Sequence, residues 1–94
     1  MKFGLFLVPL TPELRAKYER NAGALVDIVM EDSPAFTANV LPGDVLTEID
    51  GKAVESNIQA TALLRETQPA SGVSSLKVLR NGTEKTLTVR LAPN

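Results

Sequence analysis

Two dipeptides, Asp50-Gly51 and Asn81-Gly82, constrain the fold of this chain more than any other feature. A two-residue hairpin turn needs positive φ angles, and Asp, Asn and Gly are the residues that adopt them most readily. The runs before both dipeptides, VLTEI and VSSLKVLR, are interpreted as strands whose side chains alternate between two sides. Such alternation is typical of strands, and it predicts that Val45, Thr47 and Ile49 share one side of a strand. The sequence therefore predicts two β-hairpins.

Three hydroxyl residues mark the starts of helices. Thr11 and Ser33 are each followed by proline, the residue favoured at the first helical position. Ser56 begins an S-x-x-Q capping box. The predicted helices cover residues 12–20, 34–38 and 57–67, and Asn21-Ala22-Gly23 is predicted to end the first. Asn39 is predicted to be left-handed at the end of the second helix.

Apolar and β-branched runs at 3–8 and 24–30 are predicted strands, and residues 73–80 and 83–91 form the second hairpin. The elements thus follow the order strand, helix, strand, short helix, strand, short strand, helix, strand, strand. This order predicts an α+β domain: a small, mainly antiparallel sheet or partial barrel capped by one longer and one short helix. Residues 1–94 are enough for one domain with a modest core.

Composition excludes several functions. The chain contains neither Cys nor His, so a Ser-His-Asp triad, a thiolate nucleophile and the usual zinc ligands are unavailable, and no cofactor is predicted. The acids stand at turns and on exposed helix faces, so no enzyme is predicted. Ten Lys and Arg are scattered among eleven Asp and Glu, which disfavours nucleic-acid binding. The apolar run from Phe3 to Leu10 is short, contains Pro9 and lacks a cleavage site, so it is not predicted to be a signal peptide.

Three stretches resemble the PDZ domains of bacteria: DSPAFTANVLPGDVLTEIDGKAV in the middle, SNIQATALLR after it, and VLRNG with LTVRL near the end. The resemblance extends over nearly the whole chain. Asn39 stands where the family usually has glycine. The arrangement, with the groove strand near the N-terminus, is similar to the circularly permuted domains attached to periplasmic HtrA-type serine proteases. It implies a domain excised from a longer, extracytoplasmic bacterial chain, with a protease or membrane-associated parent.

The resemblance also implies a binding site for the C-terminus or an extended segment of another protein. Lys2-Phe3-Gly4-Leu5 fits the family's carboxylate loop, and residues 5–8 would be the edge strand to which the peptide adds. Leu5, Leu7 and Leu64 would line a pocket for a hydrophobic last side chain, with Phe3 at its rim. The implied peptide-binding residues are Lys2, Phe3, Gly4, Leu5, Phe6, Leu7, Asn57, Thr61 and Leu64.

Asn57 and Thr61 would meet residues further into the peptide, with only a loose polar preference at the third residue from the end. An alternative is a structural or assembly domain that docks a folded partner without recognising a free C-terminus. Asp44 is interpreted as a turn residue whose carboxylate bonds nearby amides. The basic residues of the last hairpin are interpreted as a solvated face: Lys77, Arg80, Lys85 and Arg90.

Overall fold

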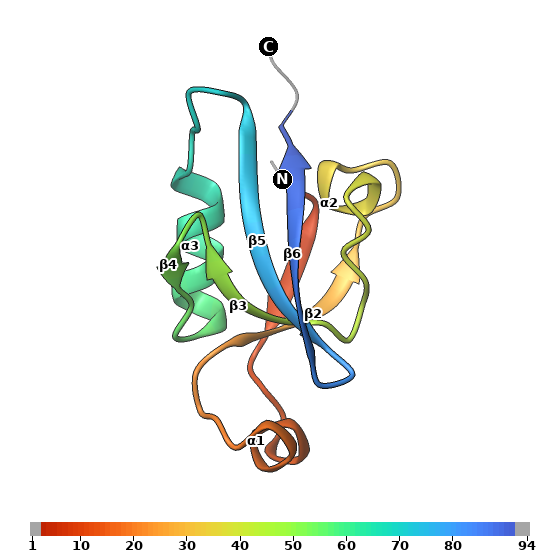
Figure 1. Ribbon diagram of the computed structural model, residues 1–94, viewed down its shortest axis with the longest axis vertical. Helices are drawn as coiled ribbons and strands as arrows, with labels where there is room; N and C mark the ends of the chain where they lie inside the picture. The colour runs from red at the N-terminus through yellow and green to blue at the C-terminus, as the bar shows by residue number, and fades with distance from the viewer. Residues whose placement is uncertain (1–2, 92–94) are drawn as a thin grey trace.

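An antiparallel sheet forms the body of the molecule (Figure 1), as a computed structural model describing residues 3–91 shows. Its main path runs β1-β2-β3-β5-β6, and β4 pairs with β3 beside that path. Together with three helices within this range, it confirms the predicted α+β fold. In chain order the elements are β1 (Leu5–Val8), α1 (Pro12–Tyr18), β2 (Ala24–Val29), α2 (Pro34–Thr37), β3 (Val45–Ile49), β4 (Lys52–Ala53), α3 (Asn57–Glu66), β5 (Val73–Arg80) and β6 (Thr83–Arg90).

The two hairpin turns form as predicted. Asp50 and Gly51 have φ angles of 50° and 82°, and Asn81 and Gly82 have nearly the same pair, 52° and 81°. Positive φ at both central residues matches the right-handed twist of the flanking strands. The second turn closes the long β5–β6 ladder, in which Val73 is paired with Arg90 and Arg80 with Thr83.

The predicted caps also form. The Oγ atoms of Thr11, Ser33 and Ser56 each accept a backbone N–H three residues on, at 3.1 Å in every case. α2 and α3 end at residues 37 and 66, each one residue earlier than predicted. The first helix ends earlier, because Glu19 turns left-handed with φ of 51° and its N–H bonds back to Ala16. The prediction that residues 21–23 end this helix was therefore wrong.

Strand β3 does not keep the simple alternation expected of it. Its pairing with β5 shifts between Leu46 and Glu48, so that Thr47 is the extra residue of a bulge. The Thr47 hydroxyl donates to the Lys77 carbonyl at 3.1 Å, which allows the side chain to be buried. Leu46 and Ile49 therefore both belong to the main core cluster, while Val45 lies outside it. The prediction that Val45, Thr47 and Ile49 share one side was wrong.

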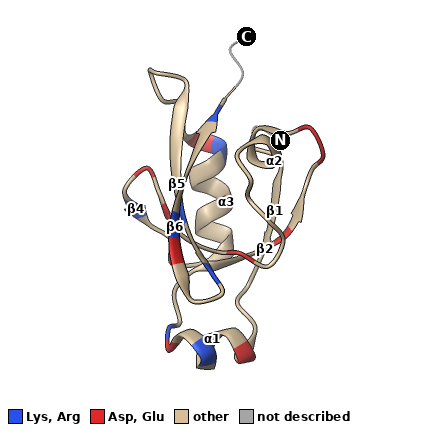
Figure 2. Cartoon of the chain, turned by 45° about the vertical axis from the view of Figure 1, so that its right-hand side comes forward, with Lys and Arg blue, Asp and Glu red and all other residues tan. Residues whose placement is uncertain are grey.

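Helix α3 covers one side of the sheet and completes the core. Ala60 and Leu64 are its buried residues, and they join apolar side chains from β1, β2, β3, β5 and β6. Figure 2 shows α3 between β1 and the β5–β6 hairpin, with α1 at the far end of the molecule. α1 has no buried residue of its own. The helix that packs on the sheet, α3, is also the one that lies beside edge strand β1.

Candidate functional site

Strand β1 ends the sheet on the side next to α3. It pairs with β2 alone among the strands of the described range, so its other edge is open there. α3 lies close to β1 (Figure 2). An open edge of this kind carries unpaired N–H and C=O groups, which are a template for another strand.

The register shows which groups of β1 face this open edge. Leu5 is paired with Val29, and the Met30 N–H donates to the Gly4 carbonyl at 2.8 Å. Hydrogen-bonded and non-hydrogen-bonded pairs alternate along an antiparallel ladder. Because the neighbouring residues Gly4 and Met30 are hydrogen-bonded, Leu5 and Val29 are not bonded to each other. The N–H and C=O of Leu5 therefore point away from β2. The N–H and C=O of Leu7, two residues further along β1, point the same way. The irregularity in this ladder does not change this, because the extra residue lies in β2 and not in β1.

Gly4 directly precedes β1, in a conformation that suits glycine. Its φ is 81°, and a Cβ atom there would clash with the Ser33 side chain, falling 2.5 Å from its Oγ. The carbonyl of the preceding Phe3 accepts the Ala35 N–H at 3.0 Å. The start of the short helix α2 therefore holds the loop before β1 in place. This role of the Ser-Pro-Ala stretch was missed in the sequence, where the stretch predicted only a helix start.

The predicted pocket residues lie together at the start of β1 and the end of α3. Leu5 and Leu64 are each 7% exposed and belong to the same core cluster, with half-buried Leu7 packed against it. Phe3 is only 2% exposed, so it is a core residue, and the expectation that it stands at the rim was wrong. Phe6 projects to the opposite face of the strand and is 44% exposed. Lys2 lies outside the described residues.

Asn57 and Thr61 precede Leu64 by two turns and one turn of α3, on the same side of the helix. Asn57 is half-buried and Thr61 is exposed. The Thr61 hydroxyl donates to the Asn57 carbonyl at 2.8 Å, so its proton is already used within the helix. The Thr61 hydroxyl is therefore available to another molecule mainly as a hydrogen-bond acceptor. We call the open edge of β1 and this side of α3 the binding edge.

Asp44 and Arg80 form a partly buried ion pair that the sequence did not reveal. The Asp44 Oδ2 accepts the Leu41 N–H at 3.0 Å, as the turn interpretation expects. Arg80 adds two bonds to the same carboxylate, Nε–Oδ1 at 2.8 Å and Nη2–Oδ2 at 2.6 Å. The hydrogen bond to Asp44 raises the pKa of Arg80 above its usual value. The placement of Arg80 on a solvated face was wrong, and Lys77 also pairs, with Glu48 at 3.5 Å.

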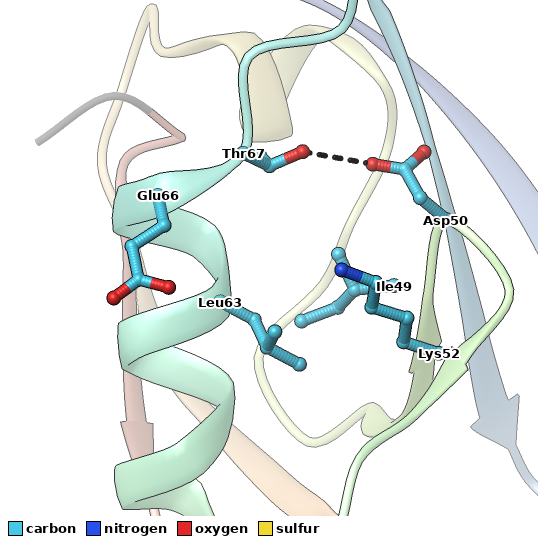
Figure 3. Close-up of a pocket in the computed structure, with 6 residues that line it drawn as sticks. All are labelled: Ile49, Asp50, Lys52, Leu63, Glu66 and Thr67. Carbon is cyan, nitrogen blue, oxygen red and sulfur yellow. Dashed lines mark hydrogen bonds between the residues drawn. The ribbon is translucent and has the colours of Figure 1, made fainter.

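Asp50 is a second missed residue, because its carboxylate joins three parts of the fold. It accepts the Ser74 hydroxyl at 2.6 Å, the Ser75 N–H at 2.7 Å and the Thr67 hydroxyl at 3.1 Å. Burial raises the pKa of Asp50, but these hydrogen bonds and the charge of Lys52 outweigh it and hold the pKa below its usual value. Figure 3 shows the bond to Thr67, which lies just after α3.

Residues 3–91 contain no group of three or more acidic, His or Cys residues placed to hold a metal ion. In the same range, no helix is both long and apolar enough to cross a membrane. Acidic and basic residues are both spread over several elements in Figure 2. The binding edge offers backbone hydrogen bonding along β1 and apolar contact beside it.

A sheet with an open edge strand beside a helix, entered through a left-handed glycine, is typical of domains that take an extended segment as an additional strand. The chain belongs to the PDZ domain family, whose model matches residues 4–91. It is similar to a probable periplasmic serine endoprotease DegP-like of Halomonas elongata, at 34% identity over 92% of this chain and 18% of the relative. A serine protease HtrA-like of Staphylococcus epidermidis is 31% identical over 76% of this chain and 12% of the relative.

Solved structures agree with this assignment. The HtrA-type protease AlgW with decapeptide superposes with a TM-score of 0.78 at 34% identity, covering 98% of this chain and 29% of that one. The HtrA3 PDZ domain bound to a phage-derived ligand shares the fold, with a TM-score of 0.77 at 19% identity over 96% of this chain and 83% of that one. The chain is thus a PDZ domain of the kind carried by HtrA-type proteases, a binding module and not the catalytic domain. It spans less than a fifth of the length of the two curated relatives.

Proposed function

We propose that this domain binds the hydrophobic C-terminus of a protein or peptide as an added β-strand between β1 and α3. The observation that carries the proposal is the open edge of β1, where the backbone groups of Leu5 and Leu7 point away from β2. Main-chain bonds to these groups would supply affinity that depends little on sequence. The terminal carboxylate would lie at the Phe3-Gly4-Leu5 loop, where the left-handed Gly4 turns the backbone.

Selectivity would come from side chains on both walls. Leu5 and Leu64 would surround the last side chain of the peptide and favour Val, Leu, Ile or Phe. Asn57 and Thr61 would lie beside the third residue from the end. The Thr61 proton is already donated to the Asn57 carbonyl, so this position would show only a loose polar preference. A short peptide loses much conformational entropy when ordered, so dissociation constants in the micromolar range are expected.

The proposal extends to the longer protein in which such a domain works. The relatives named above are serine proteases, and the Halomonas relative is named as periplasmic. The domain would then be one part of an extracytoplasmic bacterial protease and would recognise exposed C-termini or regulate the protease domain. The full chain, its substrates and its natural ligand belong to this proposal.

The test is a fluorescence-anisotropy titration with two peptides that share a hydrophobic last residue. One peptide carries a free carboxylate and the other is amidated. We expect the free acid to bind at least about tenfold more tightly, because charge-assisted hydrogen bonds to loop amides are lost on amidation. Equal binding of the two peptides would overturn C-terminal recognition.

A variant that blocks the binding edge should be placed on α3 and not at Gly4. Any side chain at Gly4 would collide with Ser33, so a Gly4 variant would disturb folding as well as binding. Thr61 is exposed, and Thr61→Trp would fill the space beside β1. Thr86→Trp is the matched control, since Thr86 is an exposed threonine on β6, at the other end of the sheet. Only the first variant should lose binding.

One observation favours the alternative of an assembly domain that docks a folded partner. Three large apolar side chains are exposed on β1 and at the end of β2: Phe6 at 44%, Ile28 at 48% and Met30 at 45%. Phe6 and Ile28 are cross-strand partners, so they form one strip. A partner that docks on this strip should no longer bind the Phe6→Thr variant. Its binding to the unaltered domain should not depend on a free carboxylate. Peptide binding that requires the carboxylate would exclude this alternative.

A further inference from the structure

The two sides of α3 face different surroundings. Asn57 and Thr61 lie on the side toward the binding edge, and the buried Ala60 and Leu64 lie at the middle. At 100° per residue, Leu63 and Thr67 project on the other side of this buried stripe. There, between α3 and the β3–β4 hairpin, is a cavity of about 100 Å³. Figure 3 shows the residues that line it, which are Ile49, Asp50, Lys52, Leu63, Glu66 and Thr67.

The cavity lies on the side of α3 away from β1. A tilt of the end of α3 into it would therefore move Leu64 away from Leu5 and enlarge the space between the two leucines. Packing opposes such a tilt only weakly on this side, because the empty volume beside Leu63 leaves fewer side-chain contacts to resist it. What opposes it is a hydrogen bond across the rim of the cavity, from the Thr67 hydroxyl to the Asp50 carboxylate at 3.1 Å.

Asp50 is a firm anchor for that bond. Its carboxylate is itself fixed by the Ser74 hydroxyl at 2.6 Å and the Ser75 N–H at 2.7 Å, and its own N–H donates to the Ser75 carbonyl at 2.8 Å. Ser74 is fully buried on β5, so the anchor is part of the rigid sheet. Thr67 follows the last turn of α3 and lies three residues after Leu64.

We propose that Asp50 and Thr67 are positioning residues that set the size of the pocket for the last side chain of the peptide. The bond between them holds the end of α3 at a fixed distance from β1, and the cavity is the room into which the helix moves when the bond is absent. This inference rests on the proposed function, since it concerns the same site. The β3–β4 hairpin thus influences the selectivity for the last side chain of the peptide, although the hairpin itself lies away from the binding edge.

The test compares two free-acid peptides that differ only in their last residue, Val or Phe. Thr67→Val removes the hydroxyl at nearly constant volume, and the extended backbone of Thr67 suits a β-branched residue. We expect the ratio of Phe to Val affinity to rise about fivefold, because the released helix admits the larger side chain. Thr67→Ser retains the hydroxyl and should leave the ratio within about twofold of the original.

Two further variants separate positioning from general loss of stability. Thr11→Ala removes the cap of α1 at the far end of the molecule, without touching Asp50 or α3, so it should lower stability and leave the ratio unchanged. Leu63→Phe places a larger side chain in the cavity and should lower the ratio by restricting the tilt. An unchanged ratio in Thr67→Val, or an equal rise in Thr11→Ala, would overturn the inference alone. If the unaltered domain does not prefer free acids over amides, the proposed function falls, and the inference with it.

Discussion

The two hairpin turns of this domain are nearly identical locally and differ in everything around them. Asp50-Gly51 and Asn81-Gly82 share their φ angles to within two degrees, and all four residues are exposed. The carboxylate of Asp50 nevertheless joins the β3–β4 turn to β5 and to the end of α3. At the other turn, the Gly82 N–H donates to the Tyr18 hydroxyl at 3.3 Å. The first turn thus anchors three parts of the fold to one another, whereas the second mainly reverses the direction of the chain.

Replacing each turn residue by alanine should show the largest difference between the turns. Asp50→Ala leaves the buried Ser74 hydroxyl without its acceptor. It also places alanine, which adopts positive φ less readily than Asp, in the left-handed conformation of this turn. We expect a loss of about 2–4 kcal/mol in the free energy of unfolding. Asn81→Ala should cost only about 1 kcal/mol, the conformational part. Urea unfolding of both variants measures this, and equal losses would show that Asp50 is no anchor.

Exchanging the two turn residues separates the carboxylate from the conformation. Asn adopts positive φ as readily as Asp, so Asp50→Asn preserves the turn and removes a charge that accepts three hydrogen bonds. A loss of about 1–2 kcal/mol is expected. Asn81→Asp should change stability by less than about 0.5 kcal/mol. Thermal or urea unfolding at neutral pH tests the pair, and a larger effect at Asn81 would contradict the comparison.

Acidification should weaken the anchor at Asp50 in a defined direction. Because the pKa of Asp50 is lower in the folded protein, its ionised form contributes stability fully above the unfolded value of about 3.9. This contribution is lost as the pH falls through the lower, folded value. The stability difference between the unaltered domain and Asp50→Asn should therefore shrink between about pH 6 and about pH 2. A difference that stays constant with pH would indicate that the charge of Asp50 does not matter.

The smallest effect is expected at the second turn. Tyr18→Phe removes the hydroxyl that accepts the Gly82 N–H, but this N–H is exposed and water can replace the acceptor. We expect a change of less than about 0.5 kcal/mol in the free energy of unfolding. Unfolding in urea beside the unaltered domain measures it. A loss as large as that of Asp50→Asn would show that both turns are anchored.

Sequence patterns found the features that depend on a few neighbouring residues. The caps at Thr11, Ser33 and Ser56, both turns and the left-handed Asn39, with φ of 69°, all formed as predicted. The order of helices and strands along the chain also formed as predicted, because each start and turn is marked by residues close together in the sequence. The resemblance to PDZ domains then located the candidate residues on β1 and α3. Their roles in binding stay predictions until peptides are measured.

Features that depend on residues far apart in the sequence were missed. Arg80 was assigned to a solvated face, yet it pairs with Asp44, thirty-six residues before it. The bulge at Thr47 turns Val45 away from the main core cluster, which alternation within β3 alone does not show. Ser33 leaves no room for a Cβ at Gly4, and no local pattern in either segment indicates that the two lie so close.

The sequence by itself determined where the chain turns, where its helices start and which residues are apolar, because these follow from backbone conformation and side-chain chemistry within a few residues. Only the tertiary structure decided that the backbone of Leu5 and Leu7 faces an open edge beside α3, and that Asp50 ties that helix to the sheet. The physical reason is that a hydrogen bond between distant segments depends on their position and direction in space, which packing of the whole core fixes.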